Sequence, residues 1–453
     1  MPHLWVPNRM NNPTVADAHT LEHSALGWKR ASALGIAIAI SGNFAGWNYG
    51  LAVGGWTGMV VAAIAMAVLF FVLAQCLAEL AASFPGGAGF DHYVRQAFGP
   101  AAGYICGVSL TTALVVGTGL AASFSAAYFH SMVGTGGWSI KLGMFALIIG
   151  LQLRGAREVA GLTVLTGAIV VVVLVAFYLY TAPHFSATNL MGHPGATRHV
   201  TAASILECVP FALFLFLGVE QSAQAAAEAQ EPGRTIPKAL AVAVLVATTL
   251  GLTTLVLATG GAGVGRLATS DDPLFTAIML HPRVPGAALM TDMVSVGALV
   301  ALMGTFFSLT YAASRQLFHF ARAGDLPAAL AVTNRRHAPW VALVLTGVFG
   351  IVSAAFQPDT VMLVFIFLVS ISYIFVLGAF IRLRYAEPDL TRPYRAVGGP
   401  VMATLGTLLA LTVAAACYQS RPAVLSWCVV GLAVSLVLFF VRSHQRATVH
   451  TAG

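Results

Sequence analysis

The sequence predicts an all-α protein that crosses a membrane many times. Of its 453 residues, 58% are hydrophobic and only 9% are charged, and the mean hydropathy is +0.84. A soluble domain usually carries about 25% charged residues, and its buried helices seldom reach the length of the apolar runs that recur along this chain. These observations favour a polytopic membrane protein over a large soluble helical one.

The basic residues give a further observation, because they fall in short loops between the apolar runs. Of the 23 lysines and arginines, we place 18 on one side of the membrane and 5 on the other. The positive-inside rule makes the richer side cytoplasmic. This distribution accounts for the pI near 9.3 without a nucleic-acid partner. It also puts both chain ends in the cytoplasm, which requires an even number of spans.

Twelve apolar runs satisfy this parity. The predicted spans are residues 29–55, 58–83, 101–130, 139–156, 159–182, 204–229, 237–260, 287–322, 339–356, 360–385, 399–417 and 424–442. Polar cytoplasmic tails at residues 1–28 and 443–453 flank them, and the first has no signal-peptide core. The sequence thus predicts a multi-pass protein of the cytoplasmic (inner) membrane, in contact with the lipid bilayer.

The first span contains a polar, glycine-rich interruption at residues 41–50. A helix broken here exposes backbone groups at membrane depth, which is tolerated only where they are buried in protein or line a cavity. The span is otherwise long enough to cross a hydrocarbon core of about 30 Å. The interruption therefore predicts a binding site.

Span six has a second interruption, in which Gly218 is followed by Glu220. If residues 29–182 and 204–385 are two repeats of five spans, the two interruptions occupy the same position in each. An odd number of spans makes the repeats opposite in orientation, and residues 399–442 add two more spans. Paired interrupted spans of this kind point to the substrate site of an inverted-repeat transporter.

Several motifs along the chain carry a family resemblance. They are the first-span glycines and residues 78–89, 93–100, 218–220, 234–237, 313–316, 323–327, 384–390 and 392–394. Together they resemble the amino acid/polyamine/organocation (APC) transporter superfamily across nearly the whole chain. The resemblance implies a leucine-transporter-like fold of five plus five inverted repeats, with helices 1 and 6 broken. It also implies a secondary transporter that works by alternating access, and not an enzyme.

Within the superfamily, residues 41–51 are similar to the ethanolamine permease branch, although Asn43 stands where that branch has an acidic residue. Asn43 and the Gly-Val-Glu of span six instead resemble the arginine/agmatine exchangers. Amino-acid carriers of the superfamily have a Gly-small-Gly turn that binds the carboxylate, where this chain has Gly46, Trp47 and Asn48. We expect Trp47 and Asn48 to crowd a carboxylate and Asn48 to meet a neutral hydroxyl, unless Trp47 packs outward and leaves the turn open.

The expected substrate is therefore a small, ethanolamine-like amine, with an amino acid, or exchange of an amino acid and an amine, as the alternative. The predicted substrate-binding residues are Ser41, Gly42, Asn43, Gly46, Trp47, Asn48, Phe214, Phe216, Gly218 and Glu220. Ser41 and Asn43 could instead cap the broken helix, and Phe214 and Phe216 could be packing rather than a gate. A carboxylate at membrane depth is a functional-site hypothesis by default, although Glu220 could also be held by a helix N-terminus.

No cofactor or metal site is predicted, because the five cysteines lie in apolar runs without metal-binding spacing. The coupling ion stays open between a proton taken up by Glu220, a sodium ion at Thr305 and Ser308, and exchange without an ion. Nothing in the sequence indicates an oligomeric state.

Overall fold

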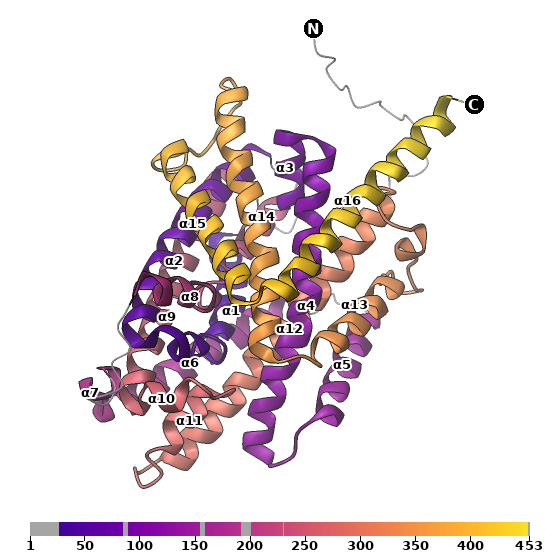
Figure 1. The fold of residues 1–453 in the computed structure, drawn as a ribbon. Coiled ribbons are helices and arrows are strands. Elements are labelled where there is room, and N and C mark those ends of the chain that lie inside the picture. The colour runs from indigo at the N-terminus through magenta and orange to yellow at the C-terminus, as the bar shows by residue number, and fades with distance from the viewer. Residues whose placement is uncertain (1–26, 85–88, 155–158, 192–200, 230, 452–453) are drawn as a thin grey trace.

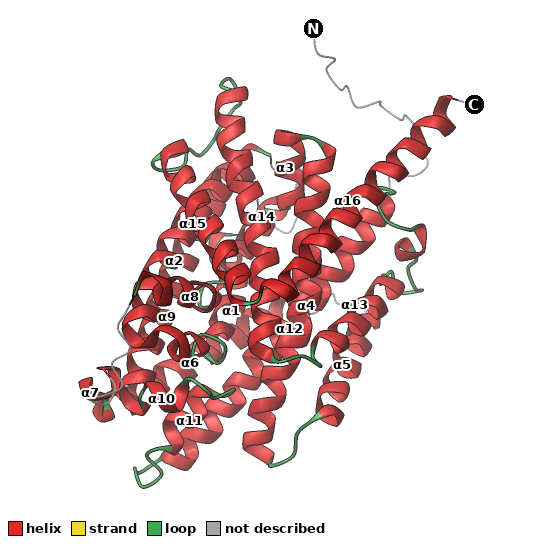
Figure 2. Ribbon diagram, in the orientation of Figure 1, coloured by secondary structure: helices red, strands yellow, loops and turns green. Residues whose placement is uncertain are grey.

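The computed structural model describes residues 27–84, 89–154, 159–191, 201–229 and 231–451. These residues form helices joined by short loops, without a strand among them (Figure 2). Eight of the described helices are long and apolar enough to cross a membrane, and three shorter apolar helices accompany them. The chain is thus an all-helical, multi-pass protein as predicted, while the count of twelve spans stays a prediction.

The helices follow the predicted spans closely. In chain order they are α1 (Trp28–Ala39), α2 (Tyr49–Ser83), α3 (Phe90–Phe98), α4 (Pro100–Val133), α5 (Trp138–Leu153), α6 (Val159–Thr181), α7 (Ala187–Met191), α8 (Ala202–Phe214), α9 (Pro232–Ala262), α10 (Val264–Leu267), α11 (Pro273–Met279), α12 (Ala287–Arg322), α13 (Trp340–Ser353), α14 (Pro358–Ala386), α15 (Gly399–Ser420) and α16 (Pro422–Thr451). Four 3-10 segments, Ile40–Asn43, Ala182–His184, Val219–Glu228 and Ala328–Ala331, complete the helical structure.

The boundary predicted between the first two spans coincides with a kink at Gly55. The backbone of Gly55 is not helical, with φ 65° and ψ −168°, so two helical parts of α2 meet at this residue. Glycine adopts this positive φ without a Cβ clash, so the chain turns within the helix. The first predicted span is accordingly divided between α1 and the opening turns of α2.

Helix α3 was not predicted, because nine residues are too few for a span and its sequence is strongly polar on one face. Its buried residues, Phe90, Tyr93, Val94 and Ala97, recur at helical spacing. α3 therefore packs its apolar face on α4 and α14 and lies across one end of the bundle (Figure 1). α10 and α11 lie at the opposite end (Figure 1).

The two broken helices occupy the middle of the fold. α1 packs against α6, α9 and the segment Val219–Glu228, while α2 packs along α8 and α9. α4 packs along α12 and α14. α16 lies at the periphery (Figure 1), where Trp427, Val434 and Val437 are exposed as lipid-facing side chains would be.

A buried charge cluster ties α2 to the end of α14 and to the chain segment after it, at the α3 end. The Glu79 side chain is 3% exposed; its Oε2 lies 2.6 Å from Arg384 Nη2 and its Oε1 lies 3.2 Å from Arg392 Nε. Glu79 also accepts a hydrogen bond from the amide of Ala396. Removing one member of a buried ion pair costs about 3–5 kcal/mol, because it leaves an uncompensated charge.

We predict that Glu79→Gln lowers stability by roughly 3 kcal/mol or more, for this reason. Glu231→Gln is the matched control, since the Glu231 and Arg234 side chains are 67% and 81% exposed and such pairs contribute at most about 1 kcal/mol. Thermal unfolding of the two detergent-purified variants provides the comparison. Equal melting temperatures would show that the Glu79 cluster is not a structural tie.

Candidate functional site

Both predicted interruptions are breaks in helices. α1 passes into the segment Ile40–Asn43 and helix resumes only at Tyr49, while α8 ends at Phe214 and helical turns resume at Val219. Within the breaks, Gly46 has φ 93° and Gly218 has φ 108°. L side chains rarely adopt these angles, so glycine allows the chain to turn at both places.

The two breaks lie in direct contact. A Cβ atom added at Gly42 would lie 2.4 Å from the carbonyl oxygen of Phe214, and one added at Gly218 would lie 2.5 Å from Ile38 Cγ2. One added at Gly35 would lie 2.2 Å from Ser222 Oγ. The glycines of α1 and of the second break are therefore what lets these two backbones approach so closely.

Side chains satisfy much of the exposed backbone in the first break. Ser41 Oγ donates to Ile38 O (2.8 Å), Asn43 Nδ2 to Ile40 O (3.1 Å), Trp47 Nε1 to Asn43 O (3.0 Å) and Tyr128 Oη to Phe44 O (2.6 Å). Asn43 is also held by Thr254, whose hydroxyl donates to Asn43 Oδ1 over 2.9 Å. Carbonyl groups that could have faced an ammonium ion are thus partly occupied by the protein itself.

In the second break, a carboxylate meets the start of a helical segment. Glu220 Oε2 accepts from the amide of Gly218 over 2.9 Å, and Glu220 Oε1 accepts from Tyr373 Oη over 3.0 Å. The side chain is buried, and its residue is 7% exposed. Backbone N–H groups at a helix start favour negative charge, so the fold provides for a carboxylate here.

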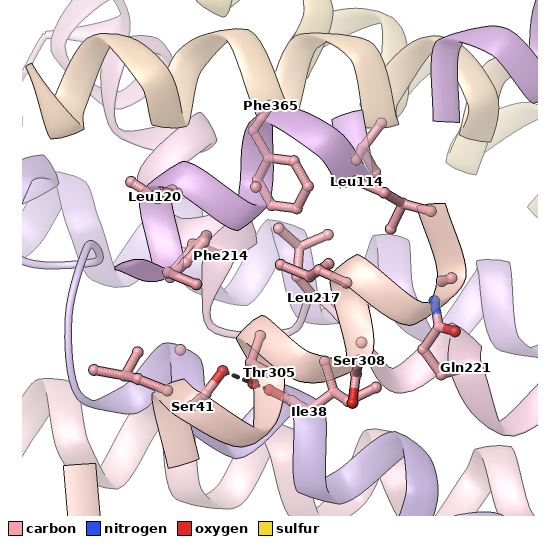
Figure 3. Close-up of a pocket in the computed structure, with 18 of the residues that line it drawn as sticks. Ile38, Ser41, Leu114, Leu120, Phe214, Leu217, Gln221, Thr305, Ser308 and Phe365 are labelled. Atoms are coloured by element: carbon pink, nitrogen blue, oxygen red, sulfur yellow. Dashed lines mark hydrogen bonds between the residues drawn. The ribbon is translucent and has the colours of Figure 1, made fainter. Parts of the chain in front are cut away.

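A cavity lies beside the crossing of the two breaks (Figure 3). It is lined from α1 and its break, α4, α8 and the second break, α12 and α14. Five of the ten predicted site residues line it: Ser41, Gly42, Phe214, Gly218 and Glu220. The structure therefore brings residues from both interruptions to one cavity, as the paired-break prediction requires.

The cavity is mostly apolar, with one acidic residue. Its walls are leucines, phenylalanines and other apolar side chains, among them Leu114, Leu217 and Phe365 (Figure 3). Among the described lining residues Glu220 is the one with an acidic side chain, and none is a lysine, arginine or histidine. The cavity therefore offers a negative charge without a side-chain cation to balance an anionic ligand.

Neutral polar groups complete the lining. Thr305 Oγ1 is buried without a hydrogen-bond partner among the described residues, and Thr305 lies next to Ser41 in Figure 3. Gln221 also lines the cavity, and Ser308 Oγ donates to its own helix at Gly304 O. Thr305 thus has an unused hydroxyl for a bound solute or ion.

Three aromatic rings form part of the cavity lining. The Phe214 ring makes edge contacts with Phe124 and Phe365, with centroids 6.2 and 6.5 Å apart. Tyr49 packs against Phe124, and its hydroxyl donates to Asp271 over 2.5 Å. Phe214 thus lines the cavity together with rings from α4 and α14, and its role as a gate stays a prediction.

The other five predicted residues lie outside the cavity lining. Asn43, Gly46, Trp47, Asn48 and Phe216 are buried beside it. Trp47 is fully buried and bonded within its own break, so its indole does not wall the cavity. Phe216 stacks on Phe70, with ring centroids 5.6 Å apart, and does not cover the site in this structure. In this conformation these residues lie in the breaks beside the cavity, and their contact with a substrate stays a prediction.

Sequence reasoning missed most of the cavity walls, namely Leu110, Leu114, Leu120, Phe124, Phe365 and Val369. They lie on α4 and α14, which run without a break or a charge at this depth, so no local signal marked them.

Thr305 was proposed from sequence as a sodium ligand, and the structure places it at the cavity. Among the described residues no group of three or more His, Cys, Asp or Glu could hold a metal ion.

The close approach of the breaks predicts that Gly42→Ala lowers transport at least about tenfold, because the added methyl overlaps the Phe214 carbonyl and forces the breaks apart. Gly143→Ala is the control, since a Cβ at Gly143 of α5 meets no atom within 4 Å. Uptake per folded protein in proteoliposomes tests both variants. Full activity in Gly42→Ala would contradict the crossing geometry.

Comparison with known proteins adds to this geometry. A family model described as amino acid permease matches residues 26–441. The branched-chain amino acid permease BcaP of Bacillus subtilis is 25% identical over 303 residues, which cover 66% of this chain and 61% of that relative.

Two further relatives match over longer segments. The aromatic amino acid transport protein AroP of Corynebacterium glutamicum is 25% identical over 337 residues, 72% of each chain. A probable GABA permease of Pseudomonas aeruginosa is 23% identical over 381 residues, 80% of this chain and 78% of the relative. This chain thus spans less than two thirds of the length of BcaP. It spans 72% of AroP and 78% of the probable GABA permease.

Proposed function

Since this chain belongs to the amino acid permease family, we propose that it is a secondary transporter whose substrate is a small primary amine such as ethanolamine. The family and the transporter names of its relatives make it a multi-pass membrane transporter rather than an enzyme. The charge of the cavity supports the proposed substrate.

The observation that carries the proposal is the presence of Glu220 in a cavity without a lining cation. At 4 Å and an effective dielectric constant of 20, two unit charges interact by about 4 kcal/mol. An ammonium group near Glu220 gains this attraction, whereas a carboxylate near it suffers a repulsion of similar size. A cationic amine is therefore the better match to the charge of the site.

The remaining lining fits the rest of a small amino alcohol. The apolar walls suit a short methylene chain, and a few placed polar groups give orientation in sites of this kind. Ser41, Gln221 and Thr305 supply such groups, and the unpartnered Thr305 hydroxyl can donate to or accept from a substrate hydroxyl.

Alternating access is the mode of transport we propose. Aromatic rings of Phe124, Phe214 and Phe365 line the cavity, and both broken helices border it. Transporters of this architecture open to each side in turn by rocking one group of helices against the other around a fixed site. That the α3 end faces the cytoplasm is part of this proposal and rests on the distribution of basic residues.

A neutral amino acid is the second candidate, favoured by the names of the relatives. Its aliphatic side chain would suit the apolar walls. Its carboxylate would need free backbone amides at a helix start. The amide of Gly218 already donates to Glu220, and the amide of Gly46 already donates to Asn48, which is why we place the amino acid second.

Counterflow in proteoliposomes distinguishes these substrates. We expect labelled ethanolamine to exchange faster than labelled alanine or arginine, because the cavity is anionic. The same assay with and without a sodium gradient and a pH step identifies the coupling ion. Faster flux of alanine would make the chain an amino acid permease in the narrow sense, and no flux of any of the three would refute all these substrates.

We further predict that Glu220→Gln weakens ethanolamine binding by about tenfold or more, equivalent to about 1.4 kcal/mol. Glutamine keeps an oxygen to accept a hydrogen bond but loses the charge. Glu207→Gln is the control, because Glu207 of α8 does not line the cavity. Equilibrium binding over a range of pH measures both variants, and unchanged affinity of Glu220→Gln at every pH would remove the carboxylate from recognition.

A further inference from the structure

We infer that the carboxamide oxygen of Asn48 fills the anion position of the first helix break, and that Asn48 thereby selects against substrates with a carboxylate. This inference rests on the proposed function and names the residue that sets its substrate class. It replaces the expectation that Asn48 meets a substrate hydroxyl, because Asn48 does not line the cavity.

Asn48 makes a hydrogen bond to the backbone within the first break. Asn48 Oδ1 accepts from the backbone amide of Gly46 over 3.1 Å, and Asn48 is fully buried. The first amides of a helical segment have no partner within the helix and readily bind an anion. Here a neutral oxygen of the protein holds the amide of Gly46, three residues before helix resumes at Tyr49.

Hydrogen bonds also fix the orientation of the Asn48 side chain. Asn48 Nδ2 donates to Leu267 O over 2.7 Å and to Ser270 O over 2.6 Å. Turning the carboxamide over would put its oxygen against two carbonyl oxygens and its nitrogen against an N–H group. The donors and acceptors of an amide are therefore all matched in one orientation, with the oxygen toward Gly46.

The same side chain also holds the chain segment between α10 and α11. Leu267 ends α10, and Ser270 lies in the loop before α11. The neighbouring Tyr49 adds its bond to Asp271 in this loop. A ligand that displaced Asn48 from Gly46 would therefore also disturb the attachment of this loop to the start of α2.

Gly46 lies close to the cavity. A Cβ atom added at Gly46 would be 3.0 Å from Cδ1 of Phe214, and Phe214 lines the cavity. A substrate carboxylate could approach the amide of Gly46 if the Phe214 ring turned and if Asn48 did not occupy the amide. Once the Phe214 ring has turned, the hydrogen bond of Asn48, rather than the bulk of the buried Trp47, is the remaining barrier to a carboxylate at Gly46.

Ethanolamine and glycine form the test pair, because both carry an ammonium group on a two-carbon chain and differ in a hydroxymethyl group against a carboxylate. Competition binding to purified full-length protein gives the ratio of their affinities. We expect the wild type to favour ethanolamine. Asn48→Gly and Asn48→Ala, which free the Gly46 amide, should each shift the ratio toward glycine by roughly tenfold or more.

Tyr49→Phe is the matched control. It removes the hydrogen bond to Asp271 and so loosens the same segment between α10 and α11. It leaves the hydrogen bond between the Gly46 amide and Asn48 in place. We expect its affinity ratio to stay within about twofold of the wild type, well below the tenfold step of one hydrogen bond to a charged group. A shift in Tyr49→Phe as large as in the Asn48 variants would assign the effect to the loop and overturn the inference.

The outcomes separate the two proposals. If the wild type favours ethanolamine and both Asn48 variants, melting as the wild type does, keep that ratio, the inference is wrong and the proposed function stands. If the wild type itself binds glycine as tightly as ethanolamine, the proposed substrate class is wrong and Asn48 has no selectivity to explain. If one Asn48 variant fails to fold, the other decides, and the wild-type comparison stands without either.

Discussion

The structure depends on one constraint, which is that backbone groups freed by two helix breaks must find partners at membrane depth. The breaks are placed against each other, with Gly42 and Gly218 allowing contact that a Cβ atom would prevent. Hydrogen bonds from side chains then satisfy much of the first break, and Glu220 satisfies the amide at the second. Unpaired backbone groups would each cost several kcal/mol, roughly, in hydrocarbon.

The position and charge of the cavity follow from this arrangement. Because the two breaks cross, the space beside them is bordered by both, and α4, α12 and α14 close its other sides. Because a carboxylate supplies the acceptor at the second break, that space carries a negative charge. Under the proposed function, residues that make the breaks stable also favour a cation in the site.

The sequence was sufficient to predict the helical membrane fold, both interruptions and the place of Glu220, because composition and local breaks in an apolar run are visible along the chain. Partners distant in sequence could not be predicted in this way. Asn43 pairs with Thr254, and Asn48 pairs with Leu267 and Ser270. Each of these asparagines looked free for substrate until the fold placed a residue more than 200 positions away beside it. The walls from α4 and α14 escaped prediction because a leucine lining a cavity and a leucine facing lipid look alike in sequence.

We propose above all that the site recognises an ammonium group and does not accept a carboxylate. Thermal stabilisation of the purified wild type by two ligands of similar size tests it directly: ethanolamine, with a hydroxyl and an ammonium group, and glycolate, with a hydroxyl and a carboxylate. Binding to the native state raises the melting temperature with ligand concentration. We expect ethanolamine to raise the melting temperature with its concentration and glycolate to leave it unchanged. An equal or larger rise with glycolate would contradict this proposal.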